Sequence, residues 1–448
     1  MTESVPFSEL GQIQVLEGST FMLSDPRGDV ETGTIGGLYH EDTRYLSHFV
    51  LTVDGERPAV LTSASVDYYS AAFFLTNSEQ EGIPEASLSI ERYRSVGDGL
   101  SEVVVIRSHL NQPIRLEVRL TCAADFADLF DVKARTHRRR GRFSSSHDPQ
   151  ASALLFEYEH RDFSAATRIH STEPARVDGD ALAFDVELLP RGTWKTKITV
   201  AFRYGETVLQ PVTEEERAAS RALVQWRETS ETLRRWREGV PRLESDSGLL
   251  DAVYRRSVED LAALRLRADV AGNEFSLPAA GLPWFMAIFG RDTLITSYQS
   301  LMIGPDLARG ALYALAGLQG KEVDDFKDEE PGKILHEIRF GELTVLGERP
   351  HRPYYVTADA TPLYLVLLSE YWRFTGDDET VRNVRPNALR ALEWIDAYGD
   401  RDADGYVEYA TRSAQGLRNQ GWKDSWNAVL FSDEIGRASC RERVYVLV

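Results

Sequence analysis

The hydrophobic periodicity of the chain changes near residue 206, and this change constrains the fold more than any other feature. Before it, short segments rich in β-branched and aromatic residues are separated by turn signals, a pattern typical of β-strands. In Ile114 to Leu120 the apolar residues take every second position, which gives a strand one apolar and one charged face. After residue 206, apolar residues recur at helical spacing. The sequence therefore predicts a multidomain protein, first β and then α.

Residues 1–205 are predicted to form an antiparallel β sandwich. The Asp54-Gly55 step that follows Tyr45 to Val53 is typical of a hairpin turn. The other expected strands are Ser87 to Tyr93, Ser101 to Leu110, Ile114 to Leu120, Leu154 to Tyr158, Ala183 to Leu189 and Thr193 to Phe202.

A polar linker helix is predicted over 206–240, where Thr213 and Glu216 match a capping box. Residues 241–434 are predicted to be helices joined by motif-bearing loops, which suits a helical toroid whose active centre is assembled from loops at one end. The expected helices are Leu249 to Ala268, Arg291 to Ile303, Asp306 to Leu318, Thr361 to Phe374, Glu379 to Tyr398 and a further candidate, Trp422 to Phe431.

The segment 435–448 resembles a translated sequencing adapter, so we expect an artefactual tail and give Cys440 no chemical role. The alternative is a genuine basic terminal segment.

The charge of the chain restricts its partners. Its 51 Lys and Arg oppose 70 Asp and Glu, and the net charge of −19 disfavours binding to nucleic acid or to an anionic membrane. With two cysteines there is no disulfide framework, which favours a reducing, cytoplasmic location. No apolar run is long enough to span a membrane, and the first residues lack a signal-peptide pattern. A neutral substrate fits this chain best, and we expect no cofactor.

The string Gly421-Trp-Lys-Asp-Ser-Trp-Asn427 is the sharpest candidate for catalysis. Asp424 lies between two indoles, which favour its neutral form, and next to Lys423, which favours its carboxylate. Cleavage of a glycosidic bond needs a carboxylic acid that protonates the leaving oxygen, and Asp424 is the candidate for this acid. The alternative is that Asp424 caps the helix predicted to run through Phe431.

A second string, Pro283 to Leu294, is a candidate for sugar recognition. It brings Trp284 and Phe289 close to Arg291 and Asp292 at the start of a predicted helix. A glucose ring stacks on aromatic faces, and its hydroxyls need directional donors and acceptors. Alternatively, the aromatic rings belong to the core, Asp292 caps the helix and Arg291 makes a structural ion pair.

Three further acidic or basic residues lie in loops between the predicted helices. His336, Glu337 and Asp359 could line the same cleft, although a solvated His–Glu pair and a helix cap are the alternatives. Asp400 to Tyr406 has the first half of a calcium-loop pattern, but Thr411 occupies the position of the bidentate Glu. This favours a turn, and no metal site is expected.

Several strings resemble those of a known family. Phe21 to Asp29, Gly37 to Ser47 and Asp125 to Phe130 resemble the N-terminal domain of bacterial glycogen-debranching (amylo-α-1,6-glucosidase-like) proteins. Phe289 to Thr293, Asp359 to Leu363 and Asn419 to Ser425 resemble the catalytic barrel of the same proteins, an (α/α)6 toroid of the glucoamylase-like superfamily.

The resemblance implies hydrolysis of α-glucans or α-glucosides with inversion, with Asp424 as the acid and with Arg291 and Asp292 at the non-reducing glucose. An α-glucan or oligosaccharide is the implied partner. The full set of predicted substrate-binding residues is Trp284, Phe289, Arg291, Asp292, Glu337, Asp359, Trp422 and Lys423.

Two departures from the family pattern modify this expectation. The chain carries about half the helices of a full toroid, and the second catalytic carboxylate of the family is expected beyond its last residue, so we expect a truncated, catalytically incomplete form. Asn427 also stands where relatives are expected to have an acidic residue. The alternatives are a glycoside phosphorylase of similar architecture and a non-catalytic carbohydrate-binding or assembly module.

Overall fold

The structure is a computed structural model that describes residues 11–424, except 81, 137, 149, 212–230, 271 and 418. The chain separates into two compact units, Met1–Ser230 and Glu231–Val448, which are described one at a time. The predicted capping box at Thr213, the predicted helix through Phe431 and the tail 435–448 with Cys440 lie outside the described residues.

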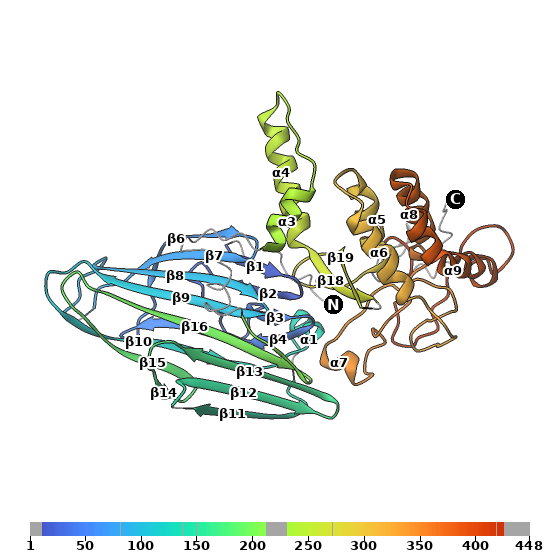
Figure 1. The fold of residues 1–448 in the computed structure, drawn as a ribbon. Helices are drawn as coiled ribbons and strands as arrows, with labels where there is room; N and C mark the ends of the chain where they lie inside the picture. The colour runs from blue at the N-terminus through green and yellow to red at the C-terminus, as the bar shows by residue number, and fades with distance from the viewer. Residues whose placement is uncertain are drawn as a thin grey trace, which may run out of the picture. The chain divides into compact units, whose positions relative to one another are not determined.

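The first unit consists almost entirely of antiparallel strands (Figure 1). One sheet has the order β1 (Ile13–Glu17), β2 (Thr20–Ser24), β3 (Gly37–His40), β4 (Thr43–Leu46). A second has the order β14 (Arg176–Asp178), β15 (Ala181–Leu188), β10 (Ile114–Ala123), β5 (His48–Val53). The 9-stranded sheet has the order β11 (Arg142–Asp148), β12 (Ala153–His160), β13 (Phe163–Ser171), β16 (Thr193–Tyr204), β9 (Gly99–Ser108), β8 (Leu88–Gly97), β7 (Ser70–Thr76), β6 (Ala59–Asp67), and β17 (Thr207–Leu209) pairs with β16. A short helix, α1 (Leu129–Ala134), follows β10.

The alternation read from the sequence decides which face of β10 is buried. Leu116, Val118 and Leu120 are buried, while the charged residues between them are exposed or half-buried. The buried face meets the 9-stranded sheet, where the rings of Phe184 on β15 and Trp194 on β16 lie 5.2 Å apart. The predicted antiparallel β structure of this half is confirmed.

The predicted hairpin at Asp54-Gly55 is present only as a turn. Both residues have positive φ, 49° and 83°, and Val53 and Glu56 exchange backbone hydrogen bonds across them. β5 then pairs with β10, which lies far along the chain, and not with β6. The expectation of a local hairpin was therefore wrong, because tertiary pairing of the apolar strands decides the partner of β5.

A fully buried charge network joins the turn before β3 to the 9-stranded sheet. Glu102 on β9 accepts from Arg92 Nε at 2.8 Å and from Arg94 Nε at 2.7 Å. Arg92 also donates to Asp29 Oδ1 at 2.6 Å, and both arginines donate to the Gly28 carbonyl. Burial alone would raise the pKa of Glu102, but the two guanidinium charges outweigh burial and hold this pKa below its ordinary value. The turn is thus held by charge-assisted hydrogen bonds in the absence of water.

We predict that Glu102→Gln destabilises the first unit by about 3–5 kcal/mol, because Arg94 loses its buried ion-pair partner and Arg92 keeps only the carboxylate of Asp29. Urea unfolding followed by circular dichroism measures the change. Glu187→Gln is the matched control, since Glu187 is exposed and lies 3.6 Å from an exposed Arg115. An equal, small effect of both substitutions would contradict the prediction.

The second unit is mainly helical, with one small hairpin. Its elements are α3 (Glu231–Gly239), α4 (Gly248–Ala263), β18 (Arg265–Val270), β19 (Asn273–Pro278), α5 (Gly290–Gln299), a 3-10 turn (Ser300–Met302), α6 (Asp306–Gly317), α7 (Glu342–Val345), α8 (Ala360–Thr375), α9 (Asp378–Trp394) and a π turn (Ile395–Gly399). Helices α5, α6, α8 and α9 share a core around Leu294, Leu312, Leu315, Tyr364 and Val384. Within the described residues these helices do not close into a ring (Figure 1).

The helix predicted through Ala268 ends at Ala263, and a strand follows. Leu266, Ala268 and Val270 alternate with Arg265, Arg267 and Asp269, a period-two pattern that favours a strand over a helix. The strand β18 pairs with β19, and Leu266 and Leu277 are buried opposite each other. Continuing the helical period past residue 264 was therefore an error.

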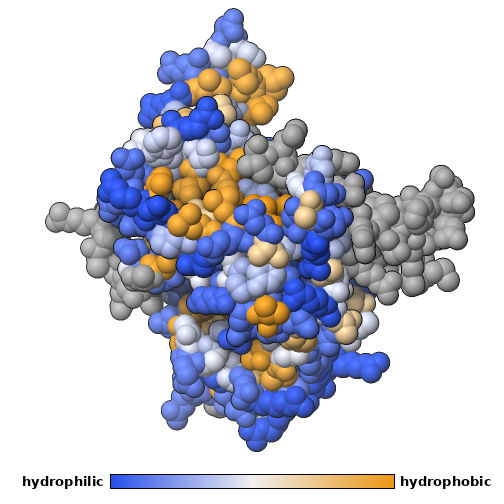
Figure 2. All heavy atoms as spheres, turned by 90° about the vertical axis from the view of Figure 1, so that its right-hand side faces the viewer, coloured by the Kyte–Doolittle hydropathy of each residue, from blue (hydrophilic) through white to orange (hydrophobic). Residues whose placement is uncertain are grey.

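The first half of α4 buries almost nothing. Leu249, Leu250 and Val253 are exposed by 76%, 50% and 53%, whereas Val258, Ala262 and Ala263 near its end are buried. Apolar surface is visible on this helix at the top of Figure 2.

Among the described residues, none of the helices is long and apolar enough to cross a membrane.

Candidate active site

The strings singled out in the second half of the sequence meet at the start of α5. The amide of Gly290 donates to the His336 carbonyl at 2.8 Å, and Phe289 forms an isolated β-bridge with Glu337. A Cβ atom at Gly290 would lie 2.0 Å from the Leu335 carbonyl oxygen, so only glycine permits this approach. The segment 335–337 therefore packs directly against the N-terminus of α5.

Two further loops join the same place. Glu337 also forms a β-bridge with Tyr354, and the amide of Ala358 donates to the Gln420 carbonyl at 2.9 Å. Backbone pairing between consecutive loops therefore brings residues 289–293, 335–339, 354–359 and 420–424 together. None of these contacts needs a particular side chain, which explains why periodicity alone could not predict them.

Arg291 is the centre of the assembled site. Its Nη1 donates to Asp359 Oδ2 and to the Gly421 carbonyl, each at 3.0 Å, and its Nη2 donates to Asp424 Oδ2 at 3.0 Å. The guanidinium carbon lies 5.5 Å from the centre of the Trp422 ring. Arg291 and Asp359 are buried, whereas the Asp424 side chain remains 35% exposed. One cation thus links three segments that are far apart in sequence.

Asp359 stands at the N-cap position of α8 without capping the helix through its side chain. Its Oδ1 accepts from the Thr357 hydroxyl at 2.6 Å, and its Oδ2 accepts from Arg291. The carboxylate is therefore turned toward the site. Thr361, in the first turn of α8, accepts from the Ile334 amide at 2.9 Å.

The charges of this cluster do not cancel. Two carboxyl groups, Asp359 and Asp424, share the single positive charge of Arg291. Asp424 is the more exposed of the two and is accessible to a ligand. The cation that contacts Asp424 is Arg291, whereas the sequence pointed to the neighbouring Lys423, whose side chain is exposed.

Glu337 lies in a separate buried ion cluster behind this site. Its Oε2 accepts from Arg339 Nε at 2.7 Å, and its Oε1 lies 3.2 Å from His351 Nε2. Burial would raise the pKa of Glu337, but the charge of Arg339 and the hydrogen bond from His351 outweigh burial and hold the pKa well below its ordinary range. Glu337 is therefore a permanent carboxylate that is already bound by protein groups.

The ring of His336 lies between the carboxylates of Asp424 and Glu337. Its Nε2 lies 3.8 Å from Asp424 Oδ2 and 4.0 Å from Glu337 Oε1. Burial is the main cause that lowers the pKa of His336, so the ring is neutral at neutral pH. Its edge-on packing against Phe289, with ring centres 5.6 Å apart, fixes the ring in the interior.

The remaining predicted substrate residues fall into exposed and buried groups. Trp422 is 67% exposed, Lys423 is exposed, and Trp284 and Asp292 are half-buried, so these four are accessible to a ligand. Phe289 is buried and lies 5.1 Å below the Arg339 guanidinium, so its ring supports the site from within.

Several residues that complete the site were missed from the sequence. Thr357, the Gly421 carbonyl, Arg339 and His351 carried no signal strong enough to single them out, although Arg339 follows Glu337 by two residues on an extended segment. Residues at that spacing share a side of the chain, which is the signal that could have found this pair.

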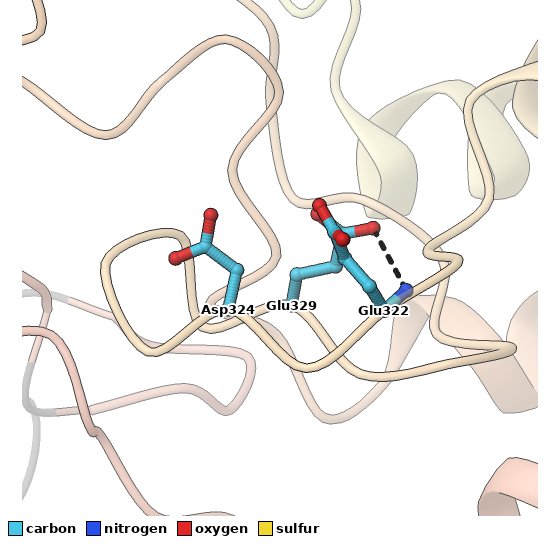
Figure 3. A group of neighbouring side chains, drawn as sticks. All are labelled: Glu322, Asp324 and Glu329. Atoms are coloured by element: carbon cyan, nitrogen blue, oxygen red, sulfur yellow. Dashed lines mark hydrogen bonds between the residues drawn. The ribbon is translucent and has the colours of Figure 1, made fainter.

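Two groups of three carboxylates occur in the described part of the chain. In the first, Glu322, Asp324 and Glu329 lie with oxygen atoms within 4.8 Å of one another (Figure 3). The ammonium of Lys327 lies 3.2 Å from Asp324 and 3.5 Å from Glu329, and Glu329 accepts the Lys321 amide at 2.8 Å. Protein groups therefore already offset the charge of this cluster.

The second group is the predicted half calcium loop, with Asp400, Asp402 and Asp404. The Asp400 carboxylate accepts the amides of Asp404 and Gly405, both at 3.0 Å. The hydroxyl of Thr411 donates to the Leu417 carbonyl at 2.6 Å and contributes to a different turn. The local hydrogen bonds are those of a turn that follows the π turn at Ile395–Gly399.

We predict that Glu337→Gln destabilises the second unit by about 3–5 kcal/mol at pH 7, because Arg339 loses its buried partner. The pKa of Glu337 is lowered on folding, so its stabilisation is complete above the ordinary value of 4.5 and is lost as the pH falls below it. The difference in stability between Glu337→Gln and the wild-type protein should therefore narrow below pH 4.5. Thermal unfolding from pH 3 to pH 8 measures it, with the exposed Glu348→Gln as control. A gap that widens in acid would refute the assignment.

Residues 15–199 match the model of a domain family described as the N-terminal domain of (some) glycogen debranching enzymes. The resemblance expected from Phe21 to Asp29, Gly37 to Ser47 and Asp125 to Phe130 is confirmed, because all three strings lie within the matched residues. A search of the curated proteins gives no match.

Solved structures add information on the fold. A protein provisionally described as a kojibiose phosphorylase from the human microbiome shares 9% identity and a TM-score of 0.54, over 88% of this chain and 58% of that one. The chain thus spans 58% of the length of that structure, and at this identity the likeness concerns the fold alone.

Two weaker likenesses have TM-scores too low to bear on the fold. A protein provisionally described as an aldose 1-epimerase from Escherichia coli K12 has 8% identity and a TM-score of 0.28, over 43% of this chain and 99% of that one. A heparinase III has 7% identity and a TM-score of 0.27, over 46% of this chain and 42% of that one.

Proposed function

We propose that this chain belongs to a glucan-active enzyme of the debranching type that hydrolyses α-glucosides, with Asp424 as the general acid. The debranching-type domain at 15–199 supports a glucan-active family. The observation that carries the proposal is the pair of carboxyl groups, Asp359 and Asp424, that share one guanidinium beside an exposed indole.

Each group has a role in this proposal. Oδ2 of Asp424 is engaged by Arg291, so the transferable proton resides on Oδ1, which protonates the leaving glycosidic oxygen. The exposed ring of Trp422 offers a face for a sugar, and Arg291 with Asp292 binds hydroxyls of the terminal glucose. Trp284 and Lys423 lie at the rim, whereas Phe289 and Glu337 hold the site from behind.

An inverting reaction also needs a carboxylate that activates water about 6.5–9.5 Å from the acid. Asp359 and Glu337 are poor candidates for this base, because arginine side chains already bind both carboxylates. We therefore assign the base to none of the described residues.

The domain arrangement is proposed along the lines expected from the sequence. It comprises a debranching-type β domain over 1–205, a linker over 206–240 that includes the short strand β17 and helix α3, and the first half of an (α/α)6 toroid over 241–434. The fold shared with a provisionally described phosphorylase supports this order of domains. A cytoplasmic location and α-1,6 specificity complete the proposal.

We predict that Asp424→Asn lowers turnover of α-1,6- and α-1,4-linked glucosides by about 10²–10⁴-fold, the contribution of a general acid, while sugar affinity changes little. Release of reducing sugar gives turnover, and calorimetry gives affinity. Asp402→Asn, an exposed residue of the neighbouring turn, is the matched control. Undiminished turnover in the Asp424 variant would exclude it as the acid.

A glycoside phosphorylase is a second candidate, favoured by the shared fold with a protein described provisionally as one. In that case phosphate replaces activated water, and sugar phosphate appears only when inorganic phosphate is added. Phosphate-independent release of free glucose would favour hydrolysis. Oligosaccharide binding with neither activity would favour a non-catalytic module.

A further inference from the structure

The segment that carries Asp424 has no regular structure of its own. Between residues 400 and 424, the described residues form turns and extended loop but neither helix nor strand. A catalytic group on such a segment keeps its position only if other parts of the protein fix the backbone. The contacts that do so come mainly from the loop 320–331 and from Tyr354.

Asp328 binds the backbone of this segment directly. Its Oδ1 accepts two successive amides, from Arg412 at 2.6 Å and from Ser413 at 3.2 Å. The Asp328 side chain is buried, and its backbone has a φ of 51°, a left-handed conformation that Asp tolerates better than most residues. One buried carboxylate thus fixes both the place and the direction of the chain at 412–413.

Glu330 binds the same point through the side chain of Arg412, with which it forms an ion pair. Its carboxylate also accepts from Trp394 Nε1 at 2.8 Å and from Arg401 Nη2 at 3.3 Å. Because Trp394 ends α9, this acid ties the segment to a helix of the core.

Tyr354 holds the segment one turn further along. Its hydroxyl accepts the Leu417 amide at 2.9 Å. A Cβ atom at Gly416 would lie 2.6 Å from this hydroxyl and 2.9 Å from Asp328 Oδ2, so the segment fits only because residue 416 is glycine. From there the chain runs through the Gln420 carbonyl, which Ala358 binds, to the Gly421 carbonyl and Asp424, which Arg291 binds.

We propose that Asp328 is a positioning residue for Asp424, which it holds through the backbone of residues 412–421, with Tyr354 as the second anchor. This inference rests on the proposed function, because the position of Asp424 affects turnover only if Asp424 is the general acid. Neither Asp328 nor Tyr354 was singled out as a functional residue by sequence patterns. A displacement of a catalytic group by about 1 Å is enough to lower turnover about 10²-fold.

The test replaces Asp328 by Gly and by Asn. Glycine accepts the positive φ without strain, so its effect reports the lost carboxylate and not the backbone. Asparagine keeps an acceptor oxygen and also tolerates this φ. Asp325→Asn is the matched control, because Asp325 is exposed and contacts only the Arg412 side chain, at 3.2 Å.

Hydrogen exchange of residues 411–421 and the kinetic constants are measured for each variant. We expect Asp328→Gly to speed exchange of the Arg412 and Ser413 amides about tenfold, the factor for one lost charge-assisted hydrogen bond. We expect kcat per folded molecule to fall about 10²-fold with a smaller change in KM. In Asp328→Asn we expect most of the wild-type protection from exchange and most of the wild-type kcat. In Asp325→Asn both quantities should match those of the wild-type protein.

A second variant keeps the test decisive if Asp328→Gly does not fold. Tyr354→Phe removes the hydroxyl that accepts the Leu417 amide and retains the buried ring, so it should speed exchange at Leu417 and lower kcat in the same sense.

The outcomes separate the two proposals. Faster exchange with unchanged kcat would overturn the positioning role and leave the proposed function intact. If the wild-type protein cleaves no glucoside, the proposed function fails, and unchanged exchange in Asp328→Gly and Tyr354→Phe would then overturn the anchoring of the segment as well.

Discussion

A single guanidinium organises the helical unit. Arg291 lies in the first turn of α5 and binds Asp359 at the start of α8, the Gly421 carbonyl and Asp424. Because the group is buried, its charge needs partners, and a planar guanidinium can serve several acceptors at fixed angles. The loops that bring these partners are also joined by backbone hydrogen bonds and by side-chain contacts such as that of the Tyr354 hydroxyl with the Leu417 amide. Loss of this cation would leave the Asp359 and Asp424 carboxyl groups close together without the positive charge that they share.

The β half was the more predictable part of the fold. Strands β8, β9, β10, β12, β15 and β16 agree with the predicted segments to within a few residues, because each is long, and β8 and β10 alternate clearly between buried and more exposed residues. The short strands β1 to β4 and the edge strand β6, with largely exposed residues, lacked such a pattern. In the helical half, the only long segment assigned to the wrong class was β18, where the period changes within a few residues.

The sequence predicted individual residues of the site but not the contacts between them. Aromatic and charged strings located Arg291, Asp359 and Asp424, since their composition differs from that of an ordinary loop. The sequence could not show that Arg291 contacts Asp424, because the two residues lie 133 positions apart and only the tertiary fold brings them together. Nor could it find Asp328, whose importance depends on two amides more than eighty positions away.

The buried network of Asp29, Arg92, Arg94 and Glu102 has a consequence for how relatives of this chain are interpreted. The turn at Asp25 to Asp29 belongs to one of the strings that identify the debranching-type domain, yet its conformation serves to close a dry ion cluster inside the β structure. In this chain the string therefore has a structural role inside the β structure. A substrate should therefore be inferred for a relative from the residues that correspond to those around Arg291, where we propose that a sugar binds.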